Sequence, residues 1–158
     1  MRKQKIYLET TIFNYYFDTD RDAHLATVQL FNEIKEGKFE AYTSVYVTKE
    51  LENAPEPKRN DMLTLIKKYG ITVIEPSDEI ERLAECYVRE GIVPQKYIFD
   101  ALHIATTTVN NLDSILSLNF QHINRAKTKQ WITPVNMREG YKGIMIFSPM
   151  EVINEENK

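Results

Sequence analysis

The sequence predicts an α/β fold, a three-layer α/β/α sandwich built around a mostly parallel central sheet. Short apolar runs of strand length alternate with longer segments of helical periodicity, which is the pattern of parallel strands joined by helices. The runs have the character of buried strands, as expected when helices cover both faces of the sheet. No repeat, low-complexity tract or linker interrupts the alternation. We therefore expect one domain over residues 1–150 and a polar tail over 151–158.

The composition supports an ordinary globular domain. A chain of 158 residues can bury roughly two thirds of its unfolded surface. The net charge of −3 argues against broad, unspecific binding of nucleic acid. The single cysteine, Cys86, cannot form an internal disulfide and is expected in the core. Without a signal peptide or a run of about 18 apolar residues, the sequence indicates a cytoplasmic protein with no membrane segment.

The strands are predicted from their apolar runs and from the turn residues that bound them. The first strand, over residues 5–9, leads directly into a helix at Thr10 and Thr11. Either threonine can cap that helix, because its hydroxyl can accept a hydrogen bond from a free N–H group of the first turn. Four further strands are expected over residues 39–43, 71–75, 112–117 and 143–147.

The helices are predicted from apolar periodicity, serine caps and glycine stops. Ser44 and Ser77 each precede a helical pattern, and Gly37 follows one in the position typical of a helix end. Helices are expected over residues 10–17, from Asp20 or Asp22 to 36 with Leu25 on the apolar face, and over 45–53, 60–69, 78–90 and part of 94–110. Towards the end of the chain, a helix over 123–131 is followed by a new start at Thr133 and Pro134.

An aspartate stands in the apolar first part of the central helix. Ile98, Leu102 and Ala105 recur on one helical face around Asp100. A charged carboxylate in such surroundings is costly unless a cation or strong donors compensate it. Taken alone, Asp100 is most simply interpreted as a helix cap. The positions of the other isolated polar residues favour a second interpretation.

Three acids and one amide occupy comparable places in the predicted fold. Glu9 ends the first strand, Glu50 borders the inward face of its helix, Asp100 lies in a first helical turn, and Asn119 follows the fourth strand. Each has a simple explanation on its own, as a solvated charge or a cap. Together they offer oxygen ligands, with neither cysteine nor paired histidine to favour zinc. Such ligands suit Mg²⁺ or Mn²⁺.

The chain resembles the PIN-domain nucleases, and especially the bacterial and archaeal toxins of the VapC type. The resemblance is carried by residues 6–11, 47–51, 99–106 and 115–120, and it extends over nearly the whole chain. The motif Asp-Ala-Leu-His-Ile-Ala in the third of these segments is the most specific. The resemblance implies a metal-dependent endoribonuclease that hydrolyses RNA phosphodiesters and is the toxin of a type II toxin–antitoxin pair. It further implies a cognate antitoxin protein and a homodimer.

Carried over by this resemblance, the catalytic and metal-binding residues are Glu9, Glu50, Asp100 and Asn119, with Thr10 or Thr11 supporting the first acid. Three carboxylates and one amide balance one divalent ion better than two, so one firmly held Mg²⁺ or Mn²⁺ is expected. The family usually has aspartate where this chain has Glu9, and Asn119 is neutral. These departures favour an alternative, a catalytically degenerate PIN-fold module for binding or assembly without nuclease activity.

Three other polar residues lie near these motifs. His103 is expected to be a packed, hydrogen-bonded core residue, and His122 is expected near the mouth of the site. Asp113 competes for the place of a fourth acid, but its position at the front of a strand favours a cap or surface role.

A basic stretch follows Asn119. Between Gln121 and Lys142, five cations oppose one acid, a net charge of +4. This stretch either attracts an RNA backbone to the site or forms a solvated helix face. Trp131 within it could stack on a base, although packing in the core is the simpler expectation.

Overall fold

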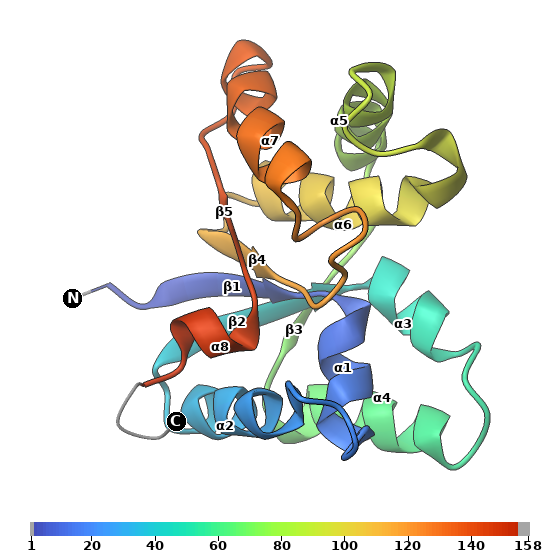
Figure 1. Ribbon diagram of the computed structural model, residues 1–158, viewed down its shortest axis with the longest axis vertical. Coiled ribbons are helices and arrows are strands. Elements are labelled where there is room, and N and C mark those ends of the chain that lie inside the picture. The colour runs from blue at the N-terminus through green and yellow to red at the C-terminus, as the bar shows by residue number, and fades with distance from the viewer. Residues whose placement is uncertain (1, 155–158) are drawn as a thin grey trace.

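The structure, a computed structural model, describes residues 2–154 and has the predicted three-layer α/β/α architecture (Figure 1). Its five strands form one sheet in the order β3-β2-β1-β4-β5, and every neighbouring pair is parallel. The strands are β1 (Gln4–Leu8), β2 (Phe39–Ser44), β3 (Thr72–Ile74), β4 (Ser114–Leu116) and β5 (Met145–Phe147).

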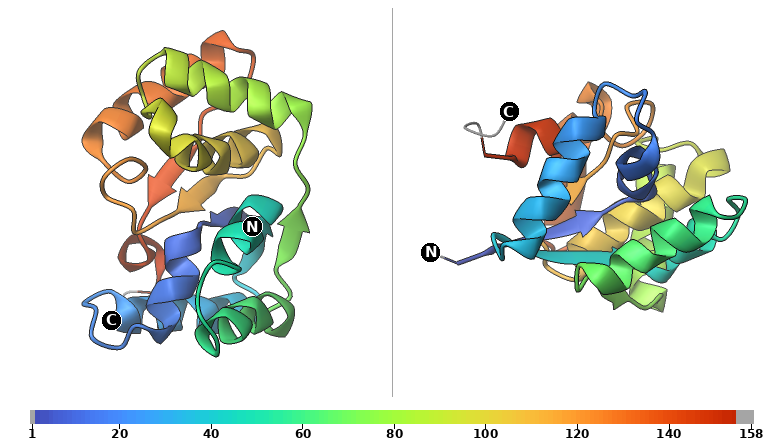
Figure 2. Two further views of the ribbon diagram at one scale, coloured as in Figure 1. Left: turned by 90° about the vertical axis from the view of Figure 1, so that its right-hand side faces the viewer. Right: turned by 90° about the horizontal axis from the view of Figure 1, so that it is seen from below.

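Helices cover both faces of this sheet, as Figures 1 and 2 show. One layer contains α1 (Thr10–Phe17), α2 (His24–Lys35), α4 (Lys58–Lys68) and the short α8 (Pro149–Val152). The other contains α5 (Asp78–Arg89), α6 (Ile98–Val109) and α7 (Ala126–Arg138), with a 3₁₀ turn over Gln95–Tyr97 before α6. Between them, α3 (Val45–Leu51) lies near the carboxyl ends of the strands, where it contacts α1, α4 and α6.

The direction in which the chain adds strands to the sheet reverses between β1 and β4. From β1 the chain proceeds to β2 and β3 on one side, and it later returns to β4 on the other side of β1. In open parallel sheets, the connections at such a switch point diverge and leave a crevice at the carboxyl ends of the strands. Leu8 pairs with Leu116 at that end, and the Glu9 amide donates to the Leu116 carbonyl at 3.2 Å. The residues that follow β1 and β4 therefore lie side by side.

The core forms around the central strand and α6. Tyr7 and Leu8 of β1 are fully buried, as expected for a strand covered on both faces. Every residue from Asp100 to Thr108 is buried, because α6 packs between the sheet and α5. Cys86 is buried as expected and remains a free thiol.

Several local expectations differ from the structure. The cap of α1 is Glu9, whose side chain accepts from the Thr11 amide, because β1 ends one residue earlier than expected. Neither Asp20 nor Asp22 opens α2, which begins at His24 after a series of turns and has no side-chain cap. Leu25 is 79% exposed and so is absent from the apolar face of α2.

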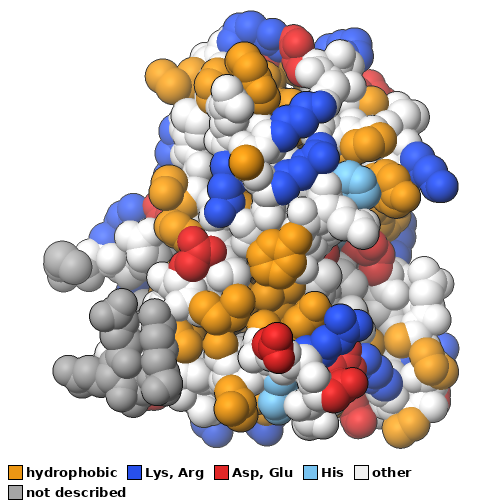
Figure 3. Space-filling model, viewed as in Figure 1, with side chains coloured by type: hydrophobic (Ala, Val, Ile, Leu, Met, Phe, Trp, Pro, Cys, Tyr) orange, Lys and Arg blue, Asp and Glu red, His pale blue; other side chains and the backbone are white. Residues whose placement is uncertain are grey.

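The expected break before Pro134 is also wrong, because α7 runs through that residue. Proline removes the bond to the carbonyl four residues earlier. Here both Pro134 and Gln130 are exposed, so water can satisfy that carbonyl. Trp131 is 49% exposed rather than packed in the core. Figure 3 shows lysine and arginine side chains gathered over α7 and the loop before it.

The expected boundary at residue 150 falls inside α8, whose capping box joins Ser148 and Glu151. The Asn154 amide donates to the Glu33 carboxylate, so the chain stays against α2 up to that point. The rest of the expected tail, residues 155–158, lies outside the described residues. No helix within residues 2–154 is long and apolar enough to span a membrane.

Candidate active site

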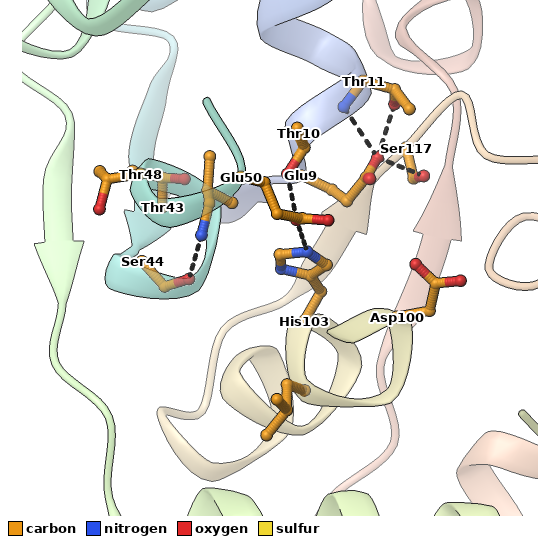
Figure 4. Close-up of polar contacts among 12 residues, drawn as sticks. Glu9, Thr10, Thr11, Thr43, Ser44, Thr48, Glu50, Asp100, His103 and Ser117 are labelled. Carbon is orange, nitrogen blue, oxygen red and sulfur yellow. Dashed lines mark hydrogen bonds and ion pairs between the residues drawn. The ribbon is translucent and has the colours of Figure 1, made fainter. Parts of the chain in front are cut away.

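Glu9 lies at the carboxyl end of β1, where it caps α1. Its Oε1 atom accepts hydrogen bonds from the Thr11 amide at 3.2 Å, the Thr11 hydroxyl at 2.5 Å and the Ser117 hydroxyl at 2.7 Å (Figure 4). Burial raises the pKa of Glu9, and these bonds offset the rise only in part. The contact expected between a threonine and the first acid is made by Thr11. The result is a carboxylate with a fixed orientation at the switch point.

Glu50 approaches from α3, at the border between buried and exposed surface. Its Oε1 atom accepts from the Thr10 hydroxyl at 2.6 Å and lies 2.6 Å from Nε2 of His103. Burial alone would raise the pKa of Glu50, but the hydrogen bond and charge of His103 outweigh it and lower that pKa. Glu50 therefore remains ionised while it is held by two residues from other helices.

His103 belongs to a continuous hydrogen-bonded chain through the core. Its side chain is fully buried, and Nδ1 lies 2.7 Å from the Tyr7 hydroxyl, which in turn lies 2.7 Å from the Ser44 hydroxyl. Burial lowers the pKa of His103, but Glu50 outweighs that effect and raises it overall. The expectation of a packed, hydrogen-bonded histidine is confirmed. Its bond to Glu50 was not expected.

Asp100 lies in the first turn of α6, three residues after the helix cap, Tyr97. Asp100 is therefore not the cap of α6. It is only 9% exposed, but its place near the helix N-terminus favours its negative charge. Its Oδ2 atom lies 3.1 Å from Nδ1 of His122, whose ring stacks on Tyr97. Burial raises the pKa of Asp100, against the lowering influence of His103 and His122. His122 thus lies in the site, as expected.

Asn119 closes the turn that follows β4. Its Oδ1 atom accepts from the amides of Gln121 and His122, each at 3.1 Å. A carbonyl oxygen has two lone pairs, and both are engaged in this arrangement. A side-chain hydrogen bond from Asn119 also lowers the pKa of Asp100. Asn119 therefore lies next to Asp100 and orders the segment that carries His122.

The three acids converge on one region. Figure 4 shows the carboxylates of Glu9, Glu50 and Asp100 facing a common space at the carboxyl edge of the sheet. The charge of Glu50 raises the pKa of both other acids, as expected of neighbouring carboxylates. Within residues 2–154, however, no three acidic, histidine or cysteine side chains are arranged to hold one metal ion. The Oε1 atom of Glu50 is engaged by His103, which leaves Oε2 as the oxygen free to bind a ligand.

The donor chemistry of this region nevertheless suits a hard divalent cation, which prefers oxygen ligands. The Oε2 atoms of Glu9 and Glu50 accept no hydrogen bond from the described residues, whereas both Oε1 atoms are fixed by donors. Asp113 takes no part, because it lies at the opposite end of β4 and binds Arg2 and Lys142.

Sequence reasoning missed two contributors to the site. Ser117 supports Glu9 from the neighbouring strand, and Tyr7 supports His103 from within β1. A signal for Ser117 was present, since a hydroxyl directly after β4 must lie at the edge where Glu9 follows β1. Tyr7 gave no such signal, because it is indistinguishable in sequence from any apolar core residue.

The fold and this cluster place the chain among α/β proteins with a carboxylate-rich region at the switch point of a parallel sheet. More specifically, the family model of the PIN domain matches residues 6–128, and the chain belongs to the PIN-domain family. A search of curated proteins finds no match.

Solved structures with this fold include the following two. VapBC2 from Rickettsia felis, bound to a DNA fragment from its promoter, has a TM-score of 0.58 and 12% identity, covering 92% of this chain and 98% of that one. VapC20 from Mycobacterium tuberculosis, described as a toxin that cleaves the sarcin-ricin loop, has a TM-score of 0.55 and 13% identity. That match covers 70% of this chain and 86% of the toxin.

Proposed function

We propose that the protein is a metal-dependent endoribonuclease and the toxin of a type II toxin–antitoxin pair. The observation that carries this proposal is the convergence of Glu9, Glu50 and Asp100, from three distant parts of a PIN-domain chain, at one sheet edge. The RNA-cleaving toxin VapC20, which has the same fold, supports the choice of substrate. The VapBC2 complex supports a cognate antitoxin as partner. We further propose that the protein forms a homodimer and acts on RNA in the cytoplasm.

Glu9, Glu50 and Asp100 would hold the Mg²⁺ or Mn²⁺ ion. Asn119 could act as a fourth metal ligand only if its Oδ1 atom gave up the hydrogen bond from Gln121 or from His122. It is therefore the weakest candidate. When bound, such an ion supplies a hydroxide nucleophile and polarises the phosphoryl oxygen.

The chain's own residues prepare the acids for this role. Thr11 and Ser117 fix the orientation of Glu9, and His122 does the same for Asp100. Thr10 and His103 hold Glu50 by one oxygen. Partners of this kind restrict the rotation of a ligand, and their removal typically costs about 10- to 100-fold in metal affinity or activity.

The test is cleavage of a structured RNA in Mg²⁺ by the wild type and by Asp100→Asn, which preserves shape and removes the charge. We expect the variant, and the wild type in EDTA, to lose about 100-fold or more of the activity. Glu52→Gln is the matched control, because Glu52 is an exposed acid directly after α3. Equal cleavage by Asp100→Asn and the wild type would refute the assignment of the site.

A second candidate function is a PIN-fold binding module without catalysis. It is favoured by the bond between Glu50 and His103 and by the engaged lone pairs of Asn119. Calorimetric titration with Mn²⁺ separates the two candidates. Heat of binding in the wild type that is absent in Asp100→Asn favours the nuclease, and its absence in both favours the module.

A further inference from the structure

Three aromatic side chains are exposed, whereas the other fourteen are buried or half-buried. Of nine tyrosines, seven phenylalanines and one tryptophan, those exposed among residues 2–154 are Tyr97 at 41%, Phe120 at 55% and Trp131 at 49%. Tyr97 caps α6, and Phe120 and Trp131 lie in the segment between β4 and the end of α7. The exposed rings therefore belong to the two segments that carry Asp100 and Asn119.

We propose that Tyr97 and Phe120 form a platform on which bases of single-stranded RNA stack beside the acidic site. This inference rests on the proposed function and specifies how the site takes its substrate. Aromatic side chains bind single-stranded nucleic acid with little sequence preference, because every base presents a π-face.

Tyr97 is held in place for such a role. Its ring stacks on His122 with a centroid distance of 4.1 Å and an interplanar angle of 28°. His122 is in turn tied to Asp100 and to the turn closed by Asn119. A base stacked on Tyr97 would extend this arrangement outward from the carboxylates. The platform and the acids are thus connected through a single histidine.

Phe120 lies inside the same turn. It directly follows Asn119, whose side chain accepts from the backbone amides of Gln121 and His122, and those bonds fix the turn around Phe120. Its ring points away from the core, since more than half of its surface is exposed. The ring of Phe120 is therefore free to contact a ligand.

Positive charge lies next to the rings. The Lys96 ammonium is 5.7 Å from the centre of the Tyr97 ring. Lys127 and Lys129 are exposed in the first turn of α7. In the part of the chain that the structure describes, none of these three lysines has an ion-pair partner, whereas Arg138 in the last turn binds Glu90 and Glu139.

The charges favour RNA as the occupant of this surface. Figure 3 shows basic side chains beside hydrophobic and histidine side chains on the face that includes α7. Rings that take bases and flexible ammonium groups that take phosphates are the two elements that single-strand binding requires. The net charge of the protein is −3, so this basic surface is local and directs an RNA strand to the site.

The experiment measures binding of a fluorescein-labelled single-stranded oligoribonucleotide in EDTA, so that binding is read without cleavage. Tyr97→Leu and Phe120→Leu keep apolar bulk but remove the ring, and we expect each to weaken affinity about tenfold. Tyr97→Phe, which keeps the ring, should stay within about twofold of the wild type. Leu25→Ala, an exposed residue of α2, should have no effect.

Two further readouts separate stacking from a structural effect. An oligoribonucleotide carrying 2-aminopurine should be quenched by the wild type and by Tyr97→Phe, but less by Tyr97→Leu. The salt dependence of binding should be unchanged in Tyr97→Leu, whereas Lys127→Gln should reduce its slope by about one unit.

Unchanged affinity and quenching in both leucine variants would overturn the proposal and leave contact with a protein as the explanation of the exposed rings. No measurable affinity of the wild type at low salt would overturn it as well. Binding that depends on Tyr97, without Mg²⁺-dependent cleavage, would refute the nuclease while supporting the platform.

Discussion

Glu50 and His103 illustrate how single side chains define this site. One is a helix residue at the edge of the core and the other is fully buried, and their contact joins α3 to α6. A buried imidazole needs partners for both nitrogens, and Tyr7 and Glu50 provide them. The pair therefore fixes Glu50 and also satisfies a polar group in the core.

The pair predicts a pH-dependent stability in metal-free protein. The pKa of His103 is raised above its ordinary value of 6.5, so its stabilising contribution is complete below about that pH and is lost as the pH rises through the raised pKa. The pKa of Glu50 is lowered below 4.5, so its contribution is lost only as the pH falls through that lowered pKa. The pair should stabilise the fold most between these limits.

Urea denaturation in EDTA checks this prediction with Glu50→Gln. The difference in free energy of unfolding between the wild type and the variant should be largest between about pH 4.5 and 6.5 and should shrink at higher pH. Glu52→Gln should show only a small and constant difference. A constant difference for Glu50→Gln as well would contradict the contact with His103.

At the scale of elements, the segment that leads into β5 passes very close to α7. A Cβ atom added to Gly143 would lie 2.7 Å from Cγ2 and 2.8 Å from Oγ1 of Thr133. Thr133 is β-branched and lies within α7, so its side chain has little freedom to move away. The glycine therefore allows the segment before β5 to pass directly over the helix.

We expect Gly143→Ala to lower the free energy of unfolding by about 1–3 kcal/mol, the usual cost of overpacking. Thr133→Ala removes both atoms that clash, so the double variant should recover part of this loss. A double-mutant cycle from urea denaturation measures the coupling. Strictly additive effects would show that no clash exists.

The sequence predicts elements well where local chemistry decides them. Ser44 and Ser77 were expected as caps and are caps, because a serine hydroxyl next to free amides needs no distant partner. The start of α2 and the continuity of α7 were predicted wrongly. α7 continues through Pro134 because the carbonyl that loses its partner is exposed to water, and local backbone bonds place Asp20 and Asp22 in turns before α2.

At the scale of the whole molecule, alternation of strands and helices was enough to predict the parallel sheet. It also predicted that residues after strands share one edge, which brings Glu9 and Asn119 together. Local partners such as Thr11 were predicted, but the contact of Ser117 with Glu9 was missed, because the two residues are 108 positions apart and their contact depends on the strand order. Likewise, the exposure of Trp131 depends on how α7 is oriented, which periodicity does not reveal.

Metal binding should be visible in the stability of the whole fold. A ligand present at a hundredfold excess over its Kd stabilises the native state by about 2.7 kcal/mol. For a chain of this size, Mn²⁺ at that excess should raise the Tm of the wild type by about 5–10 °C. Differential scanning fluorimetry should show a much smaller rise for Asp100→Asn, and EDTA should reverse the effect.

Glu52→Gln serves as the control and should respond to Mn²⁺ like the wild type. An equal rise of Tm in Asp100→Asn would indicate that the ion binds elsewhere on the molecule.

The order of strands also governs when the proposed active site can first form during synthesis of the chain. Glu9 and Glu50 leave the ribosome early, but Asp100 and Asn119 follow much later, and β4 must insert beside β1 before they meet. An mRNA truncated upstream of the codon for Ser114 therefore yields a fragment that contains Glu9 but lacks Ser117, which orients it. Only a chain translated past β4 can therefore assemble the complete site that we propose.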